Sequence, residues 1–373
     1  VQARPQHNAY HLFTVDRHLL ETTARASALT GRVERVDLLA IVALLHDIGK
    51  GYPGDHSKVG AELIQTMTAR MGFSPDEVAT FGELVRHHLL LPDAATRRDL
   101  DDPGTLQMVA RTVKTRERLH LLWALTEADS LATGPSAWSP WKASLVTELV
   151  GRVDKVLQGT PAGNFTNGAF PTDEQLKKLA DGRHTIEAGN GVVTVYASDR
   201  PGTFSRVAGV LALHGLDVLS ANAYSSDDGR ALSQFKVADP RRDVTPWDRV
   251  HKDLKLALEG GLALQARVAE RARTYGKRKP TTRKPVAASV RFDNHSSQHA
   301  TVIEVHAADG VGVLYRITRA LADLDLDIRS AKVQTMGGKV VDSFYVRGQE
   351  GGKITDGHTL KELEKAVLHS LTD

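Results

Sequence analysis

The segment His46-Asp47-Ile48-Gly49-Lys50 brings an imidazole, a carboxylate and an amine close together in the chain. It follows an apolar run over residues 38–45, which predicts a buried helix. Burial of a histidine beside an aspartate costs free energy unless another group pairs with them. A divalent metal ion would pair with both side chains at once. The segment therefore predicts one half of a metal site.

Two further residues qualify as ligands of the same ion. His18 lies in a stretch, residues 12–29, with apolar residues at helical spacing. Asp129 shares one face of a predicted helix with Leu122 and Leu125, so its carboxylate points into the core. Imidazole and carboxylate ligands without thiolate favour a hydrolytic centre of Mn or Mg, with Fe or Zn as alternatives. Such an ion lowers the pKa of bound water and neutralises charge on phosphoryl oxygens.

The first part of the chain is predicted to be a helical domain over residues 1–160 that positions these ligands. Strand-like alternation is nearly absent there, and apolar residues recur at helical spacing. The predicted helices cover residues 12–29, 38–45, 60–71, 77–91, 106–131 and 141–157. A Gly- and Pro-containing stretch then begins a linker, which we expect over residues 161–188.

A small α+β unit occurs twice in the second part of the chain. Residues 192–197 and 302–307 are rich in β-formers, and each run is followed by a turn and a predicted helix. The copies keep one register, in which Asp199 matches Asp309, Gly202 matches Gly312, and Arg206 matches Arg316. This tandem repeat predicts two domains, at residues 189–270 and 299–373.

A basic segment, residues 271–298, separates the two copies, with Lys and Arg side chains around Pro280 and Pro285. It is either a solvated linker or an arm that binds phosphate or a partner. The net charge of +3 is too small to imply nucleic acid. The absence of cysteine excludes disulfides, thiolate metal sites and cysteine nucleophiles. No apolar run approaches the ~20 residues that cross a bilayer, so we expect a cytoplasmic protein without membrane contact.

The order His, His-Asp, Asp across a helical domain resembles the HD phosphohydrolase superfamily. More specific segments resemble the family of bifunctional uridylyltransferase/uridylyl-removing enzymes, which modify the PII nitrogen-signalling protein. These segments are residues 10–18, 46–51, 54–57, 85–90 and 138–142. That family carries two carboxy-terminal ACT domains, which the repeat also resembles. The resemblance therefore covers nearly the whole chain.

The resemblance implies a multidomain fold, with an all-α HD-domain helical bundle followed by two α+β ferredoxin-like ACT domains of βαββαβ order. The family begins with a nucleotidyltransferase domain, and nothing before His18 leaves room for one. We therefore expect the chain to be the carboxy-terminal part of such an enzyme, with the transferase activity missing and the removing activity retained.

In the resembling family, the HD domain hydrolyses the phosphodiester between a nucleotide and a tyrosine of PII. The resemblance assigns the metal ligands as His18, His46, Asp47 and Asp129. Lys50 is expected to stabilise phosphoryl charge, the alternative being a surface lysine at a helix end. His87, with His56 and His88, is expected to hold a second metal or the phosphate. The nucleotide removed is either UMP or AMP.

ACT domains bind a small ligand where the first strand turns into its helix, and the family points to glutamine as the effector. Gly202 and Gly312 would let the backbone approach the ligand, the helix amino ends would bind its carboxylate, and Asp199 and Asp309 its ammonium group. The expected effector contacts are Asp199, Gly202, Thr203, Asn222, Asp309, Gly312 and Val313. The alternative is plain turn chemistry. ACT domains pair within or between chains, so either a monomer or a homodimer is expected.

Two other functions compete with this one. A guanosine tetraphosphate hydrolase also joins an HD domain to an ACT domain, but it places further modules between them and lacks the second ACT unit. An amino-acid sensor with an inactive HD domain would bind effector without hydrolysis. The intact set of metal ligands argues against that sensor.

Overall fold

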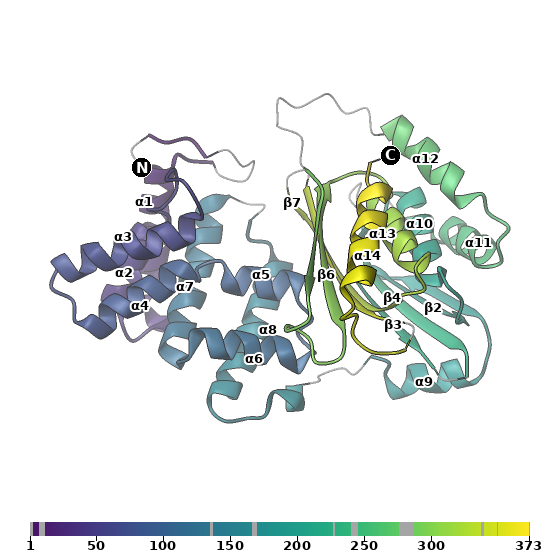
Figure 1. Cartoon of the computed structure of the whole chain (residues 1–373), viewed down its shortest axis with the longest axis horizontal. Coiled ribbons are helices and arrows are strands. Elements are labelled where there is room, and N and C mark those ends of the chain that lie inside the picture. The colour runs from purple at the N-terminus through teal and green to yellow at the C-terminus, as the bar shows by residue number, and fades with distance from the viewer. Residues whose placement is uncertain are drawn as a thin grey trace. The chain divides into compact units, whose positions relative to one another are not determined.

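The protein is described by a computed structural model that covers residues 3–6, 12–134, 137–165, 170–226, 228–239, 245–275, 287–336, 339–348 and 350–372. The chain divides into two compact units, Val1–Phe165 and Thr166–Asp373. The first is helical, and the second combines a sheet with helices (Figure 1). No helix among the described residues is long and apolar enough to cross a membrane.

The first unit is a bundle of helices packed on one apolar core. Its α-helices are α1 (Val15–Ala26), α2 (Val36–Leu45), α3 (His56–Arg70), α4 (Pro75–Arg86), α5 (Leu90–Arg97), α6 (Pro103–Val113), α7 (Arg116–Thr133) and α8 (Pro140–Leu157). Short 3-10 helices cover Ser27–Arg32 and Ala162–Phe165. Helix α7 packs against α1, α2 and α8, so its side chains reach the centre of the bundle.

Two of the predicted helices are in fact broken. The stretch predicted over residues 106–131 is α6 and α7, separated at Lys114, whose φ of 66° cannot continue a right-handed helix. The stretch over residues 77–91 ends as α4 at Arg86, and α5 begins at Leu90. Helix α4 begins at a capping box between Ser74 and Glu77, with Pro75 in its first turn.

The second unit contains one antiparallel eight-stranded sheet of order β1-β2-β4-β3-β7-β8-β6-β5. Its strands are β1 (Thr185–Gly189), β2 (Val192–Ser198), β3 (Asp217–Ser225), β4 (Arg230–Ala238), β5 (Ser289–Asp293), β6 (Thr301–Ala308), β7 (Asp327–Met336) and β8 (Lys339–Arg347). Its helices are α9 (Asp173–Ala180), α10 (Thr203–His214), α11 (Trp247–Leu258), α12 (Leu264–Tyr275), α13 (Val313–Ala322) and α14 (Gly357–Ser370).

The expected pair of α+β domains is present, since each half of this sheet supplies four strands and two main helices. The order of elements differs in one respect from the expected βαββαβ. The outer strand of each half, β1 or β5, precedes the first core strand, so each half runs β-β-α-β-β-α. Strands and helices therefore extend into the segments expected as linkers. The centre of the basic segment, residues 276–286, lies outside the described residues.

The two halves join edge to edge through β3 and β7, with Ala221 opposite Ala331. Helices α10, α11, α13 and α14 cover one face of the sheet and share its main core (Figure 1). On the other face, Leu179 of α9 packs near Tyr196 and Leu232. The two copies of the repeat thus pair within one chain.

Candidate metal centre

Helices α1 and α7 bring two of the predicted ligands, His18 and Asp129, together. His18 is fully buried, and its Nε2 lies 3.0 Å from Oδ1 of Asp129. Asp129 follows Leu122 and Leu125 along α7, and those two side chains are buried in the core. The helical spacing therefore turns the carboxylate inward, as predicted, and leaves 19% of its side chain accessible.

His46 and Asp47 follow α2 directly, with 0% and 2% of their surface exposed. Nδ1 of His46 lies 3.0 Å from the carbonyl oxygen of Ala43, which leaves Nε2 to face Asp47 and Asp129. The turn that follows packs tightly on α3. A Cβ on Gly49 would lie 2.1 Å from the carbonyl oxygen of His56, so only glycine permits this approach.

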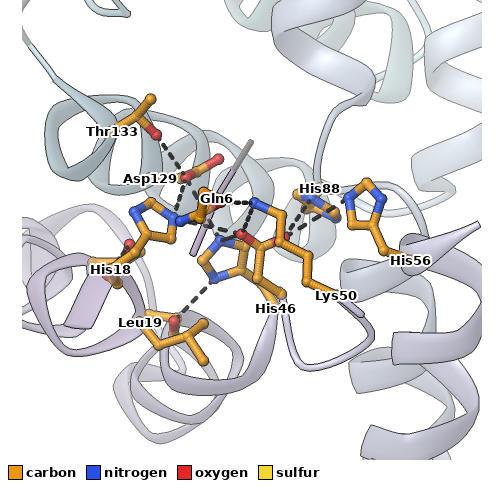
Figure 2. Close-up of polar contacts among 12 residues, drawn as sticks. Gln6, His18, Leu19, His46, Lys50, His56, His88, Asp129 and Thr133 are labelled. Carbon is orange, nitrogen blue, oxygen red and sulfur yellow. Dashed lines mark hydrogen bonds and ion pairs between the residues drawn. The ribbon is translucent and has the colours of Figure 1, made fainter. Parts of the chain in front are cut away.

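Three of these side chains form a group that fits a metal ion, and the Asp129 carboxylate lies beside it. Ligand atoms of His18, His46 and Asp47 lie within 4.8 Å of one another. Nε2 of His46 lies 3.5 Å from Asp47 Oδ2 and 3.6 Å from Asp129 Oδ1, too far for good hydrogen bonds. Within the described residues this buried nitrogen makes no hydrogen bond. A buried polar atom without a partner is costly, and a cation between these ligands would satisfy it (Figure 2).

A second ligand group shares Asp47. It consists of Asp47, His56 and His88, with Asp47 Oδ1 lying 3.8 Å from Nε2 of His56 and 3.7 Å from Nε2 of His88. His88 is buried, and its Nδ1 lies 2.7 Å from the Val85 carbonyl oxygen. Oδ1 of Asp47 has no hydrogen bond among the described residues. The two oxygens of one carboxylate thus face two separate ligand groups, an arrangement suited to bridging two ions.

The electrostatics of the cluster keep its two carboxylates ionised. Burial would raise the pKa of Asp47, but His46, Lys50 and His88 together lower it far below its ordinary value. Burial would likewise raise the pKa of Asp129, and the nearby imidazoles of His18 and His46 lower it. Burial lowers the pKa of His88 to about 4, so its imidazole is neutral at neutral pH and able to bind a metal. The carboxylates are therefore ionised at neutral pH.

Lys50 lies at the edge of the cluster and is not an ordinary surface lysine. Its Nζ lies 2.5 Å from Oδ2 of Asp47 and donates a hydrogen bond of 2.6 Å to Oε1 of Gln6. About 22% of its side chain is exposed. Figure 2 shows Lys50 between the His18–Asp129 side of the cluster and the side that holds His56 and His88. A cation at this place can face both the ligands and an incoming anionic substrate.

His87 is not part of the cluster in this structure. Its Nε2 lies 3.6 Å from Oε2 of Glu83, one helical turn earlier, and 30% of its side chain is exposed. Helix α4 ends at Arg86, and neighbouring side chains at a helix end point in different directions. His88 takes the buried direction, so the structure places His88, and not His87, beside Asp47.

Lys142 is a residue near the site that the residue types alone did not single out. Burial lowers the pKa of its amine, and the nearby Asp129 carboxylate opposes that effect. Its Nζ donates a hydrogen bond of 3.0 Å to the carbonyl oxygen of Ala137. The signal that could have found it is the Trp138-Ser139-Pro140-Trp141-Lys142 segment, which served only for the family resemblance.

The residues expected to bind an effector lie at two equivalent turns of the sheet unit. Asp199, Gly202 and Thr203 line a cavity of about 370 Å³. Asn222 lies on β3 opposite Ser330, and its neighbours Ala223 and Tyr224 line this cavity. The other three, Asp309, Gly312 and Val313, occupy the turn between β6 and α13.

Comparison with known proteins agrees with this architecture. Residues 15–134 match the HD domain family, residues 191–245 match the ACT domain family, and residues 296–372 match the ACR family N-terminal ACT domain.

Several relatives carry the name bifunctional uridylyltransferase/uridylyl-removing enzyme. The relative from Streptomyces coelicolor is 41% identical over 94% of this chain and 48% of its own length. The relative from Gluconobacter oxydans is 34% identical over 100% of this chain and 46% of its own length. One from Mycobacterium tuberculosis is 39% identical over 92% of this chain and 44% of its own length. The chain thus spans about half the length of these relatives.

Proposed function

The chain is homologous over nearly its whole length to part of the bifunctional uridylyltransferase/uridylyl-removing enzymes, and we propose that it performs the removing reaction. Its substrate would be a PII protein that carries UMP or AMP on a tyrosine, and glutamine would regulate the reaction through the ACT domains. The observation that carries this proposal is the buried cluster in which Asp47 faces two groups of histidines.

The proposed cofactor is a divalent metal, Mn or Mg first and Fe or Zn as alternatives. His18, His46, Asp47 and Asp129 would hold one ion, and Asp47, His56 and His88 a second. Bound metal would supply a water of lowered pKa and Lewis-acid stabilisation of phosphoryl charge. The chain itself would orient the histidine ligands. Nδ1 of His46 pairs with the carbonyl oxygen of Ala43, and Nδ1 of His88 with that of Val85, and these hydrogen bonds fix both imidazole rings.

The reaction would be hydrolysis of a phosphodiester. Water adds to phosphorus, the bond from phosphorus to the tyrosine oxygen breaks, and the nucleoside monophosphate and tyrosine are released. Tyrosinate is a reasonable leaving group because the pKa of the phenol is about 10. Lys50 would place its ammonium group beside the non-bridging phosphoryl oxygens, where negative charge is present throughout the reaction. Its contact with Asp47 holds it at the edge of the ligand cluster.

The test is incubation of the chain with uridylylated and adenylylated PII in Mn²⁺, with detection of free nucleotide. We expect release of one of the two nucleotides, and no release by the Asp47→Asn variant. Hydrolysis of guanosine tetraphosphate without release from PII would favour the competing enzyme function. A chain that binds glutamine but contains no metal and releases nothing would contradict the proposal and favour the sensor.

A further inference from the structure

The helix layer of the sheet unit contains a cavity of about 740 Å³ that is lined by α12, α13 and α14 (Figure 1). This volume lies within the ~300–1,000 Å³ range of small-molecule sites. The lining residues of α14 are Ala366, His369 and Ser370, which have the i, i+3, i+4 spacing of one helix face. Val268 and Ala272 on α12 have the same spacing. The cavity is therefore bounded mainly by helix faces, which hold it in a defined shape.

Small apolar side chains line much of this cavity. Ala269 and Ala272 come from α12, Ala320 from α13, and Ala366 from α14. Each lies on the face that its helix turns toward the cavity, where a larger aliphatic side chain would fill the space. Protein interiors are normally close-packed, so a space that alanines leave open is suited to the apolar body of a ligand.

Three guanidinium groups line the same cavity. Arg316 and Arg319 lie about one turn apart on α13, and Arg273 lies on α12. Among the described residues that line the cavity, Asp323 supplies the one carboxylate. Its Oδ2 lies 4.0 Å from Nε of Arg319, and 70% of its side chain is exposed. Three cations and one carboxylate leave a formal surplus of two positive charges.

This surplus of charge selects among anionic ligands. Guanidinium groups bind phosphate oxygens through parallel hydrogen bonds. A phosphomonoester carries about −1.5 to −2 charge at pH 7, because its second pKa is about 6, and this charge matches the surplus. A carboxylate would compensate only part of it. An amino acid fits less well, because its ammonium group would face the same guanidinium groups.

We propose that the cavity lined by α12, α13 and α14 binds a nucleoside monophosphate. Its phosphate would lie at Arg273, Arg316 and Arg319, and the flat base would lie against the alanines. The amide of Gln265, which also lines the cavity, offers a donor and an acceptor to the base or the sugar. This site belongs to the sheet unit and requires neither the metal cluster nor the hydrolytic reaction.

Calorimetric titration of the full chain with AMP and with UMP tests the proposal, in EDTA so that the His and Asp cluster holds no metal. We expect saturable binding of at least one of them, weakened ~10–100-fold in Arg316→Gln through the lost charged hydrogen bonds. Arg206→Gln is the matched control, because Arg206 corresponds to Arg316 in the repeat and lines a different cavity, of about 680 Å³. It should bind as the wild type does.

A second variant, Ala272→Phe, should prevent binding by filling the cavity, and thermal unfolding checks that it is folded. Inorganic phosphate and adenosine test the two parts of the ligand, and each should bind more weakly than AMP. Four results would overturn the assignment: no heat with AMP and UMP, equal losses in Arg206→Gln and Arg316→Gln, phosphate binding as tightly as AMP, or displacement of AMP by glutamine. Nucleotide release from PII is measured separately, so neither result decides the other.

Discussion

Replacing Asp342 by asparagine should make the sheet unit more stable, and increasingly so as the pH rises. Burial raises the pKa of this carboxyl to about 8 from an ordinary 3.8, and Asp309 adds to the increase. Its side chain is enclosed on the helix face of the sheet, next to Val305 and Val333 of the neighbouring strands. Asparagine keeps the shape of the protonated acid and cannot ionise.

The direction of this pH dependence follows from the number of protons that the folded and unfolded chains bind. Above about pH 4 the unfolded chain has lost the Asp342 proton, and the folded chain keeps it until about pH 8. The folded state therefore binds more protons in this window, and the free energy of unfolding decreases by about 1.4 kcal/mol per pH unit because of this group. The difference between Asp342→Asn and wild type should widen by about 3 kcal/mol between about pH 5 and about pH 7.

Hydrogen exchange measured by mass spectrometry on peptides of β8 can follow this unit separately from the helical one. Ser233→Asp provides the matched control, because it places a carboxyl at the equivalent position of β4 and should create the same pH dependence. Parallel stability curves for Asp342→Asn and wild type across this pH range would refute the reasoning. They would mean that the carboxyl is ionised and solvated in the folded chain.

Three further predictions concern the candidate metal cluster and the packing of α12 against α10. Asp47→Asn should lose both ions, because Asp47 belongs to both ligand groups, whereas His87→Gln should keep the wild-type metal content in elemental analysis. Lys50→Met should retain metal and lose ~10²-fold in the rate of nucleotide release; an unchanged rate would remove Lys50 from the catalytic groups. Gly209→Ala should destabilise the sheet unit by about 1–3 kcal/mol in thermal unfolding, because its Cβ would lie 2.8 Å from Leu264 and Tyr315. Gly151→Ala on α8, where nothing lies within 4 Å, should be neutral or slightly stabilising.

The sequence was sufficient to predict the local features of the candidate metal site. The apolar run before His46 and the helical spacing of Leu122, Leu125 and Asp129 depend only on periodicity, and each indicated which side chains face the core. The doubled turns with Gly202 and Gly312 were also visible, because a left-handed position before a helix selects glycine locally. The order of the domains and the residues that meet in the His and Asp cluster could therefore be predicted from the chain alone.

Tertiary structure decided which residues meet. His87 and His88 are adjacent in sequence, and only the packing of α4 determines that His88 reaches Asp47 while His87 faces Glu83. The two turns share an aspartate and a glycine at matching positions, yet only the packing of α12 determines that Val268 lies against Gly312 while no such contact is made at Gly202. A local pattern specifies which way a side chain points along its own element. Which distant group it meets depends on how the elements pack, and that is fixed by the whole core.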